Sequence, residues 1–211
     1  METNKKIIDA LTWRRAIRVF DPTKKVSDAD LLTILESAQL SPSSYGLEPW
    51  KFFVISDPRM REKLRKVGYD QPKITEASHL IILAHRTDGE AVVDELITLT
   101  ARIQNKREED LAGFKQMLDD ALFHRAPGII RDDWFKAQTY IALGVMIATA
   151  SSLGIDNGPM EGFDTDAVNE LLGLKEKNLS AATMLTLGYR DEHEQLPAKV
   201  RREYTDVVEF I

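Results

Sequence analysis

The stretch Ser41-Pro42-Ser43-Ser44-Tyr45-Gly46-Leu47-Glu48-Pro49-Trp50 separates a helical pattern from a buried strand. Its two prolines and its glycine favour an irregular backbone, and its serines offer hydroxyls and N–H groups that neither a helix nor a β-ladder would use. Most loops only connect two elements, so this one is either a plain connector or part of a binding site. The sequence on both sides of this loop is needed to distinguish the two interpretations.

A basic segment, Trp13-Arg14-Arg15-Ala16-Ile17-Arg18-Val19-Phe20, follows an amphipathic helical pattern at the N-terminus. If the segment is extended, Arg14, Ala16 and Arg18 lie on one side of it. If the helix continues, Arg14 and Arg18 share a face as an i,i+4 pair. Both geometries bring two guanidiniums together. They form either a solvated edge paired with acids or an anion site.

The rest of the chain alternates helical and strand patterns. Core strands are expected at 51–55, 79–84 and 181–188. Helices are expected after Ser27-Asp28-Ala29-Asp30, after Asp57-Pro58, over 92–103, over 134–153 with Asp132 or Asp133 as its cap, and over 164–172. Residues 154–163 are interpreted as a glycine-rich loop that lets backbone N–H groups approach a flat ligand. The region that follows the charged run 106–110 and extends to residue 127 is interpreted as a mobile cover, whose aromatic side chains mainly pack.

Composition limits the function classes. The 211 residues carry a formal net charge of −6, which disfavours a general nucleic-acid or anionic-membrane surface. No cysteine is present, so disulfides and thiolate chemistry are excluded, and a cytoplasmic protein is the simplest interpretation. Neither a targeting segment nor a transmembrane run is visible, and no linker or repeat divides the chain. We therefore predict a single domain over 1–211.

Several catalytic signatures are missing from the sequence. It contains no Gly-x-Gly-x-x-Gly fingerprint and no Walker loop, and the four histidines lack metal-ligand spacing, so no metal site is predicted. No nucleophile elbow is present either. Basic groups at both ends of the chain, a hydroxyl-rich loop and a glycine-rich loop remain. Such a set suits a phosphate-bearing cofactor that does its own chemistry.

Four motifs, in order and at suitable spacing, carry a family resemblance that covers nearly the whole chain. They are the arginine-rich segment at 14–21, Pro42-Ser43-Ser44 with Glu48-Pro49-Trp50, Pro159-Met160-Glu161-Gly162-Phe163, and the closing Lys199-x-Arg201. The sequence resembles the FMN-dependent, oxygen-insensitive NAD(P)H nitroreductases. The resemblance implies an α+β fold with a mixed sheet flanked by helices, in an intertwined homodimer with FMN at each subunit interface.

The resemblance also implies roles for basic residues. Arg14, Lys199 and Arg201 match positions that hold the FMN phosphate, with help from Arg15 and with Ala16 in the same segment. Arg18 and Lys73 match the basic positions near flavin N1 and the C2 carbonyl. Asp70 stands where the family often has an asparagine that bonds the pyrimidine edge. That departure matters, because an ionised carboxylate has no hydrogen to donate.

Two further segments match positions around the flavin ring. Pro42, Ser43 and Ser44, followed by Gly46, match the loop that reaches the cofactor from the partner subunit. Pro159, Met160, Glu161 and Gly162 match the loop over the ring, where the Glu161 N–H would face N5. Gly46 and Glu48 stand where many members have Asn and Gln, and Phe114 or Phe123 is a candidate for the aromatic that lines the substrate channel.

The implied activity is a ping-pong reaction. NADH or NADPH would pass hydride to flavin N5, and a nitroaromatic or quinone would then accept two electrons. Two alternatives stay open: a free-flavin reductase or dehalogenation-specialised relative on the same scaffold, and a non-catalytic flavin-binding or dimeric interaction protein. In the second alternative the basic residues would simply pair with the many acids.

Overall fold

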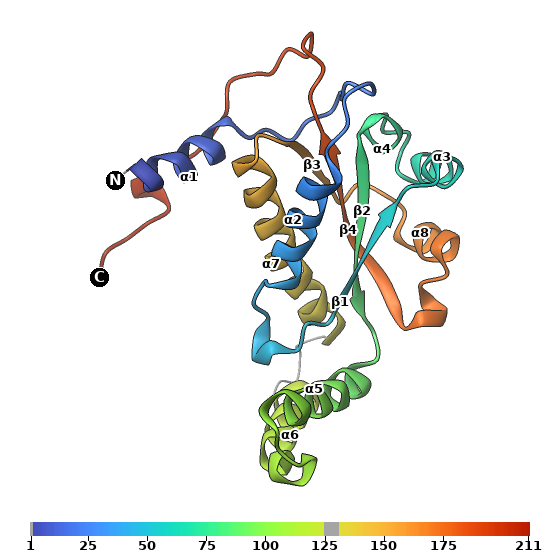
Figure 1. Ribbon diagram of the computed structural model, residues 1–211, viewed down its shortest axis with the longest axis vertical. Coiled ribbons are helices and arrows are strands. Elements are labelled where there is room, and N and C mark those ends of the chain that lie inside the picture. The colour runs from blue at the N-terminus through green and yellow to red at the C-terminus, as the bar shows by residue number, and fades with distance from the viewer. Residues whose placement is uncertain (1, 125–130) are drawn as a thin grey trace.

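The computed structural model describes residues 2–124 and 131–211. Its sheet has four strands in the order β1-β2-β4-β3, and each neighbouring pair is antiparallel (Figure 1). The strands are β1 (Trp50–Ile55), β2 (His79–Arg86), β3 (Asp156–Met160) and β4 (Leu179–Gly188). The α+β class is confirmed. The sheet is antiparallel where a mixed one is expected, because parallel pairing occurs outside these strands, at the bridge between Ala16 and Asn157.

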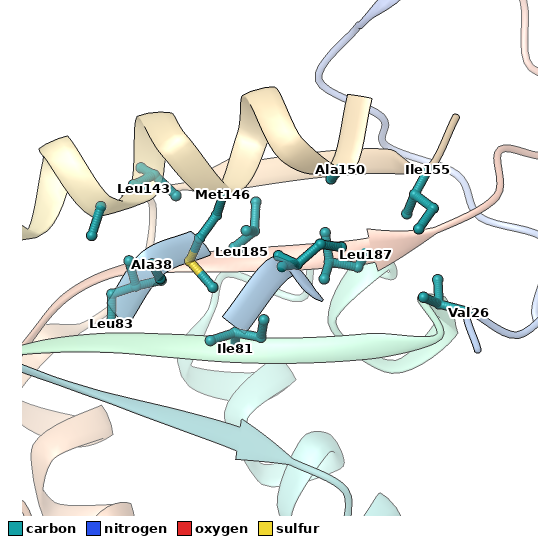
Figure 2. Close-up of a cluster of buried hydrophobic side chains, with 12 residues drawn as sticks. Val26, Ala38, Ile81, Leu83, Leu143, Met146, Ala150, Ile155, Leu185 and Leu187 are labelled. Carbon is teal, nitrogen blue, oxygen red and sulfur yellow. The ribbon is translucent and has the colours of Figure 1, made fainter. Parts of the chain in front are cut away.

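One face of the sheet is covered by α2 (Asp28–Gln39) and α7 (Arg131–Ser152). The central strands alternate, so that Ile81 and Leu83 of β2 face these helices. Figure 2 shows how side chains from α7, α2, β2 and β4 interdigitate in this layer. The helix predicted over 134–153 is thus confirmed and begins three residues earlier than expected.

The opposite face is covered by α3 (Pro58–Val67), α4 (Lys73–Glu76) and α8 (Thr165–Leu172). The alternate residues of the central strands, such as Leu80 and Ile82, pack here and are fully buried. Both central strands are therefore buried on both faces. This explains why their sequences are nearly continuous apolar runs.

Helix caps follow the sequence with one exception. Ser27, Asp57 and Asp164 each accept a hydrogen bond from a backbone N–H at a helix start, at 3.0–3.1 Å. Asp132 and Asp133, however, lie inside the first turn of α7, so the prediction that one of them caps it was wrong. An acidic residue stabilises a helix either as its N-cap or, through the helix dipole, inside its first turn, and the sequence pattern of the two cases is similar.

A separate cluster lies at one end of the molecule, at the bottom of Figure 1. It is formed mainly by α5 (Gly89–Gln104), η2 (Glu108–Leu111), α6 (Ala112–Asp119) and the π-helical turn Asp120–His124. Phe114 and Phe123 pack against this cluster, which confirms the expected packing role. Residues 125–127 of the predicted cover lie outside the described residues.

The glycine-rich region predicted as a loop contains a strand, β3. Pro159 is tolerated because β3 is an edge strand. Gly158 allows a close approach, since a Cβ there would lie 2.6 Å from Thr186 Oγ1 and 2.7 Å from the Ile17 carbonyl oxygen. The prediction failed because the composition of this edge strand is that of a turn.

The two ends of the chain lie together, away from the sheet. The N-terminal helix α1 (Glu2–Trp13) and the C-terminal tail, which includes η5 (Tyr204–Asp206), project to the same side in Figure 1. Both expose apolar side chains, and Phe210 is 85% exposed in this single chain. Among the described residues, no helix is long and apolar enough to cross a membrane. The remaining short helices are η1 (Ser44–Gly46) and η4 (Lys175–Lys177).

Candidate functional site

Basic residues from both ends of the chain meet where α1 ends. The Lys199 ammonium donates hydrogen bonds to the carbonyl oxygens of Leu11 at 2.5 Å and Arg14 at 3.0 Å. This contact brings the tail beside the carbonyls at the end of α1, where a cation is favoured. We define the basic cradle as Arg14, Arg15, Lys199 and Arg201. Arg14 and Arg15 lie near the start of the sequence and Lys199 and Arg201 near its end, and the fold brings the two pairs together.

The cradle residues repel one another. Burial lowers the pKa of Arg14, and the charges of Arg201 and Arg15 lower it further. The pKa of Lys199 is lowered by burial and then by Arg14, Arg201 and Arg15. Excess positive charge held at one place favours the binding of an anion.

The adjacent cavity has a volume of about 470 Å³ and contains the second basic group. We call it the Lys73 cavity; its lining residues are Ala16, Arg18, Gln71, Pro72, Lys73 and Pro159. Lys73 is only 8% exposed, and its pKa is lowered by burial and by the charge of Arg18. The volume lies in the range of small-molecule sites.

An extended segment connects the cradle to the cavity. The N–H of Ile17 donates to the carbonyl of Asn157 at 3.0 Å, and Ala16 forms a parallel bridge with the same residue. Ala16 and Ile17 therefore pair with the edge of β3, and because α1 ends at Trp13, the helix does not continue through this segment. Arg14 reaches the cradle and Arg18 the cavity, so one short segment contributes to both.

The loop after β3 is held residue by residue. Thr183 donates its hydroxyl hydrogen to the Met160 carbonyl at 2.9 Å, and the Gln71 amide donates to the Gly162 carbonyl at 2.8 Å. Between them, the Tyr140 hydroxyl donates to the Glu161 carboxylate, and burial together with this carboxylate raises the pKa of Tyr140. These bonds keep the backbone of the loop in one position beside the cavity wall.

Asp70 lies apart from the cavity. Its carboxylate accepts a hydrogen bond from Arg65 at 2.7 Å, and its side chain is 81% exposed. Gln71, the next residue, lines the cavity instead, as does Pro72. Neither residue was predicted from the sequence, although both lie in the short interval between Asp70 and Lys73. Asp70 has a left-handed backbone with φ of 51°; its own side chain is exposed, whereas that of Gln71 lines the cavity.

The hydroxyl-rich loop at 41–50 lies apart from the Lys73 cavity in space. The Ser44 N–H donates to the Gln138 side chain of α7 at 2.9 Å, and the Ser43 hydroxyl accepts from the Glu48 N–H at 2.8 Å. Gly46 has a φ of 70°, which glycine adopts without strain. Among the described residues that line the Lys73 cavity, none comes from this loop. In Figure 1 the loop joins the lower end of α2 to β1, whereas residues 14–18 lie at the top.

Comparison with known proteins identifies relatives over the whole chain. The nitroreductase family model matches residues 11–189. A Staphylococcus epidermidis protein named "Putative NAD(P)H nitroreductase" is 38% identical and covers 100% of this chain and 99% of its own.

Solved structures show the same fold. A Bacillus subtilis protein described as the putative nitroreductase ydfN has a TM-score of 0.87 at 19% identity, covering 99% of this chain and 100% of its own. An Exiguobacterium sibiricum protein, described as a putative nitroreductase in complex with FMN, has a TM-score of 0.77 at 21% identity, covering 98% and 96%. At these identities the structures establish the fold. With the family match and the 38% identical relative, they show that this chain belongs to the nitroreductase family.

Proposed function

We propose that this protein is an FMN-dependent oxidoreductase that uses NADH or NADPH. Two findings on relatives support the proposal: the staphylococcal protein is named for NAD(P)H nitroreduction, and the Exiguobacterium structure is described as a complex with FMN. The same chemistry is implied by the motifs of the sequence. The proposal requires that the site residues of this chain match the charge and hydrogen-bonding groups of FMN.

One observation carries the proposal: among the described residues, the basic groups of the site form no ion pair with an acid. Within residues 2–124 and 131–211, none of the cradle side chains, nor Arg18 or Lys73, forms an ion pair with a described carboxylate. Elsewhere arginines do pair, as Arg86 does with Asp88 and Glu95. In a chain of net charge −6, this arrangement argues against basic residues that merely pair with nearby acids.

The two basic groups fit the two polar ends of FMN. Arg14, Arg201 and Lys199 would hold the phosphate, because guanidinium forks match its oxygens. Arg15 would add positive charge at the same place. Lys73 and Arg18 would stabilise negative charge that develops on the pyrimidine side of the ring when it is reduced. Bound FMN would supply the redox chemistry, taking hydride from the nicotinamide and passing two electrons to an acceptor.

Uncharged groups would orient the ring. The loop Pro159, Met160, Glu161 and Gly162 would lie over it, with the Glu161 N–H toward N5. The Gln71 NH2 group donates to the carbonyls of Gly68 at 3.0 Å and Gly162 at 2.8 Å, so its amide oxygen would be the acceptor for the pyrimidine N–H, whereas Asp70 lies outside the cavity lining. We therefore assign to Gln71 the role that the family pattern gave to Asp70.

The partner subunit would complete the site. Pro42, Ser43, Ser44 and Gly46 lie away from the Lys73 cavity of their own chain, as expected if they reach the cavity of a second copy. The exposed apolar side chains of α1 and the tail offer surface for such a homodimer. The proposal thus places one FMN at each of two interfaces.

The acceptor is proposed by family analogy to be a nitroaromatic or a quinone. A free flavin or a halogenated substrate is the alternative on the same scaffold, and acceptor choice separates them. A cytoplasmic location, where reduced nicotinamide is supplied, belongs to the same proposal.

The test is an anaerobic absorption experiment on protein loaded with FMN. We expect NADPH or NADH to bleach the flavin bands, and a nitroaromatic or quinone to restore them. Bands that resist both donors would leave a non-catalytic flavoprotein. Protein that takes up no FMN would overturn the proposal. Bands that only free flavin restores would establish the free-flavin reductase.

A further inference from the structure

Arg61 of α3 is a buried cation that forms no ion pair with any acid in the described ranges. The residue is 8% exposed, and burial lowers the pKa of its guanidinium. Across the described part of the chain, its side chain donates to backbone carbonyls rather than carboxylates: Ile74 at 2.7 Å, Ala77 at 2.6 Å and Ser78 at 3.4 Å. A buried charge held only by backbone carbonyls is costly, so its position invites a functional explanation.

The carbonyls that Arg61 binds lie in and directly after the short helix that begins with Lys73. Ile74 is the next residue, while Ala77 and Ser78 follow the last turn of α4. A helix of one turn leaves most of its carbonyls without intrahelical partners. The planar fork of arginine can satisfy several of them at once, whereas an ammonium group has a different geometry.

Other contacts hold the same turn in place. At Gly68, the residue after α3, a Cβ would lie 2.4 Å from the Ile74 side chain, so α3 and the turn are closely packed. From the other side, the Lys73 side chain approaches Gly158 of β3, where a Cβ would lie 3.5 Å from Lys73 Cδ. Lys73 is thus enclosed between the turn held by Arg61 and the edge strand.

We propose that Arg61 is a positioning residue that holds the Lys73 ammonium in the wall of the cavity. Its three hydrogen bonds fix the backbone on which Lys73 is carried. The consequence for the cofactor rests on the proposed function. The consequence for Lys73 itself does not, because it concerns the free protein.

Two substitutions separate charge from geometry. Arg61→Lys keeps the positive charge and loses the fork, and Arg61→Met removes both. Arg59→Lys is the matched control, since Arg59 lies two residues away on α3 with a side chain that is 92% exposed. If Arg61→Met fails to fold, Arg61→Lys still decides the question.

The first measurement is the reactivity of Lys73 toward an amine-acylating reagent in the free protein, followed by mass spectrometry. We expect labelling of Lys73 to rise about tenfold in Arg61→Lys, because a charged hydrogen-bond set that holds the turn is weakened. Arg59→Lys should label like the wild type. Unchanged labelling in a folded Arg61→Lys protein would overturn the proposal.

The second measurement is the ratio of affinities for reduced and oxidised FMN. We expect the preference for the reduced form to fall about tenfold in Arg61→Lys, which for a two-electron couple is about 30 mV. A purely structural bond would lower both affinities and leave the ratio unchanged, which would count against a positioning role. If the wild type itself binds no FMN, the proposed function fails, and the labelling result still decides the role of Arg61.

Discussion

The Lys73 cavity and the hydroxyl-rich loop at 41–50 are both held by many contacts, yet they lie in different parts of the molecule (Figure 1). In the cavity wall, the side chain of Lys73 on α4 packs beside Gly158 of β3 and near the charge of Arg18. The loop is anchored to α7 through Gln138 and an edge-to-face contact between Tyr45 and Trp134, with ring centroids 6.0 Å apart. Under the proposed function, the two regions would be half-sites of one chain that do not face each other, and each would need a second copy to complete it.

The largest effect is expected from Lys73. Replacing it in Lys73→Met should lower the rate of FMN-dependent NADPH oxidation about 100-fold, because a preorganised charge aimed at the reacting group is lost. Lys51→Met, on the exposed side of β1, is the control. Equal rates in both variants would show that the cavity is not the reactive half.

The next effect tests the close packing of the cavity wall. Gly158→Ala should lower the free energy of unfolding by about 2–3 kcal/mol, because its Cβ would collide with Thr186 and the Ile17 backbone. Gly113→Ala in α6 has open space around it and should gain about 0.5–1 kcal/mol. Denaturant unfolding of both proteins measures the contrast. A Gly158→Ala protein as stable as the wild type would contradict this geometry.

The basic cradle should affect binding more than rate. Arg201→Ala is expected to weaken FMN affinity about tenfold, as a charged hydrogen bond to phosphate is lost, and to reduce its salt dependence. Arg202→Ala changes the neighbouring charge and should bind nearly normally. Titration at two salt concentrations checks this. Equal losses in the two variants would point to general charge rather than a phosphate contact.

The smallest expected effect is a pH dependence. Burial and Arg18 lower the pKa of Lys73 below its ordinary 10.5, so the folded free protein binds this proton less readily than the unfolded chain. The resulting destabilisation is full at pH values below the lowered pKa of Lys73 and is relieved as the pH rises through that pKa toward 10.5. Any stability advantage of Lys73→Met over the wild type should therefore shrink with rising pH. An advantage that grows instead would contradict the sign.

The sequence was informative where local chemistry is unambiguous. Ser27 and Asp57 cap helices because their side chains match helix starts, and the central strands are apolar because both faces are buried. It failed at β3, whose Gly158 and Pro159 resemble a turn. The family resemblance also anticipated the membership that the relatives establish. The single domain over 1–211 stays a prediction.

Side-chain direction was harder to predict than residue membership in a site. The family resemblance marked Asp70, but the Asp70 side chain binds Arg65, and Gln71 lines the cavity instead. Arg61 gave no signal at all, because its partners are backbone carbonyls that no sequence pattern records. Both facts depend on tertiary packing.

The most direct test of the divided site is the FMN content of a hybrid dimer. One chain carries Arg14→Ala with Arg201→Ala, which disables the cradle, and the other carries Ser44→Trp, which obstructs the loop. If cradle and loop come from different chains, the hybrid has one intact site and should hold half the FMN of the wild type, although each parent dimer holds little. If each chain builds its own site, every site in the hybrid is defective. A hybrid as empty as its parents would contradict the account.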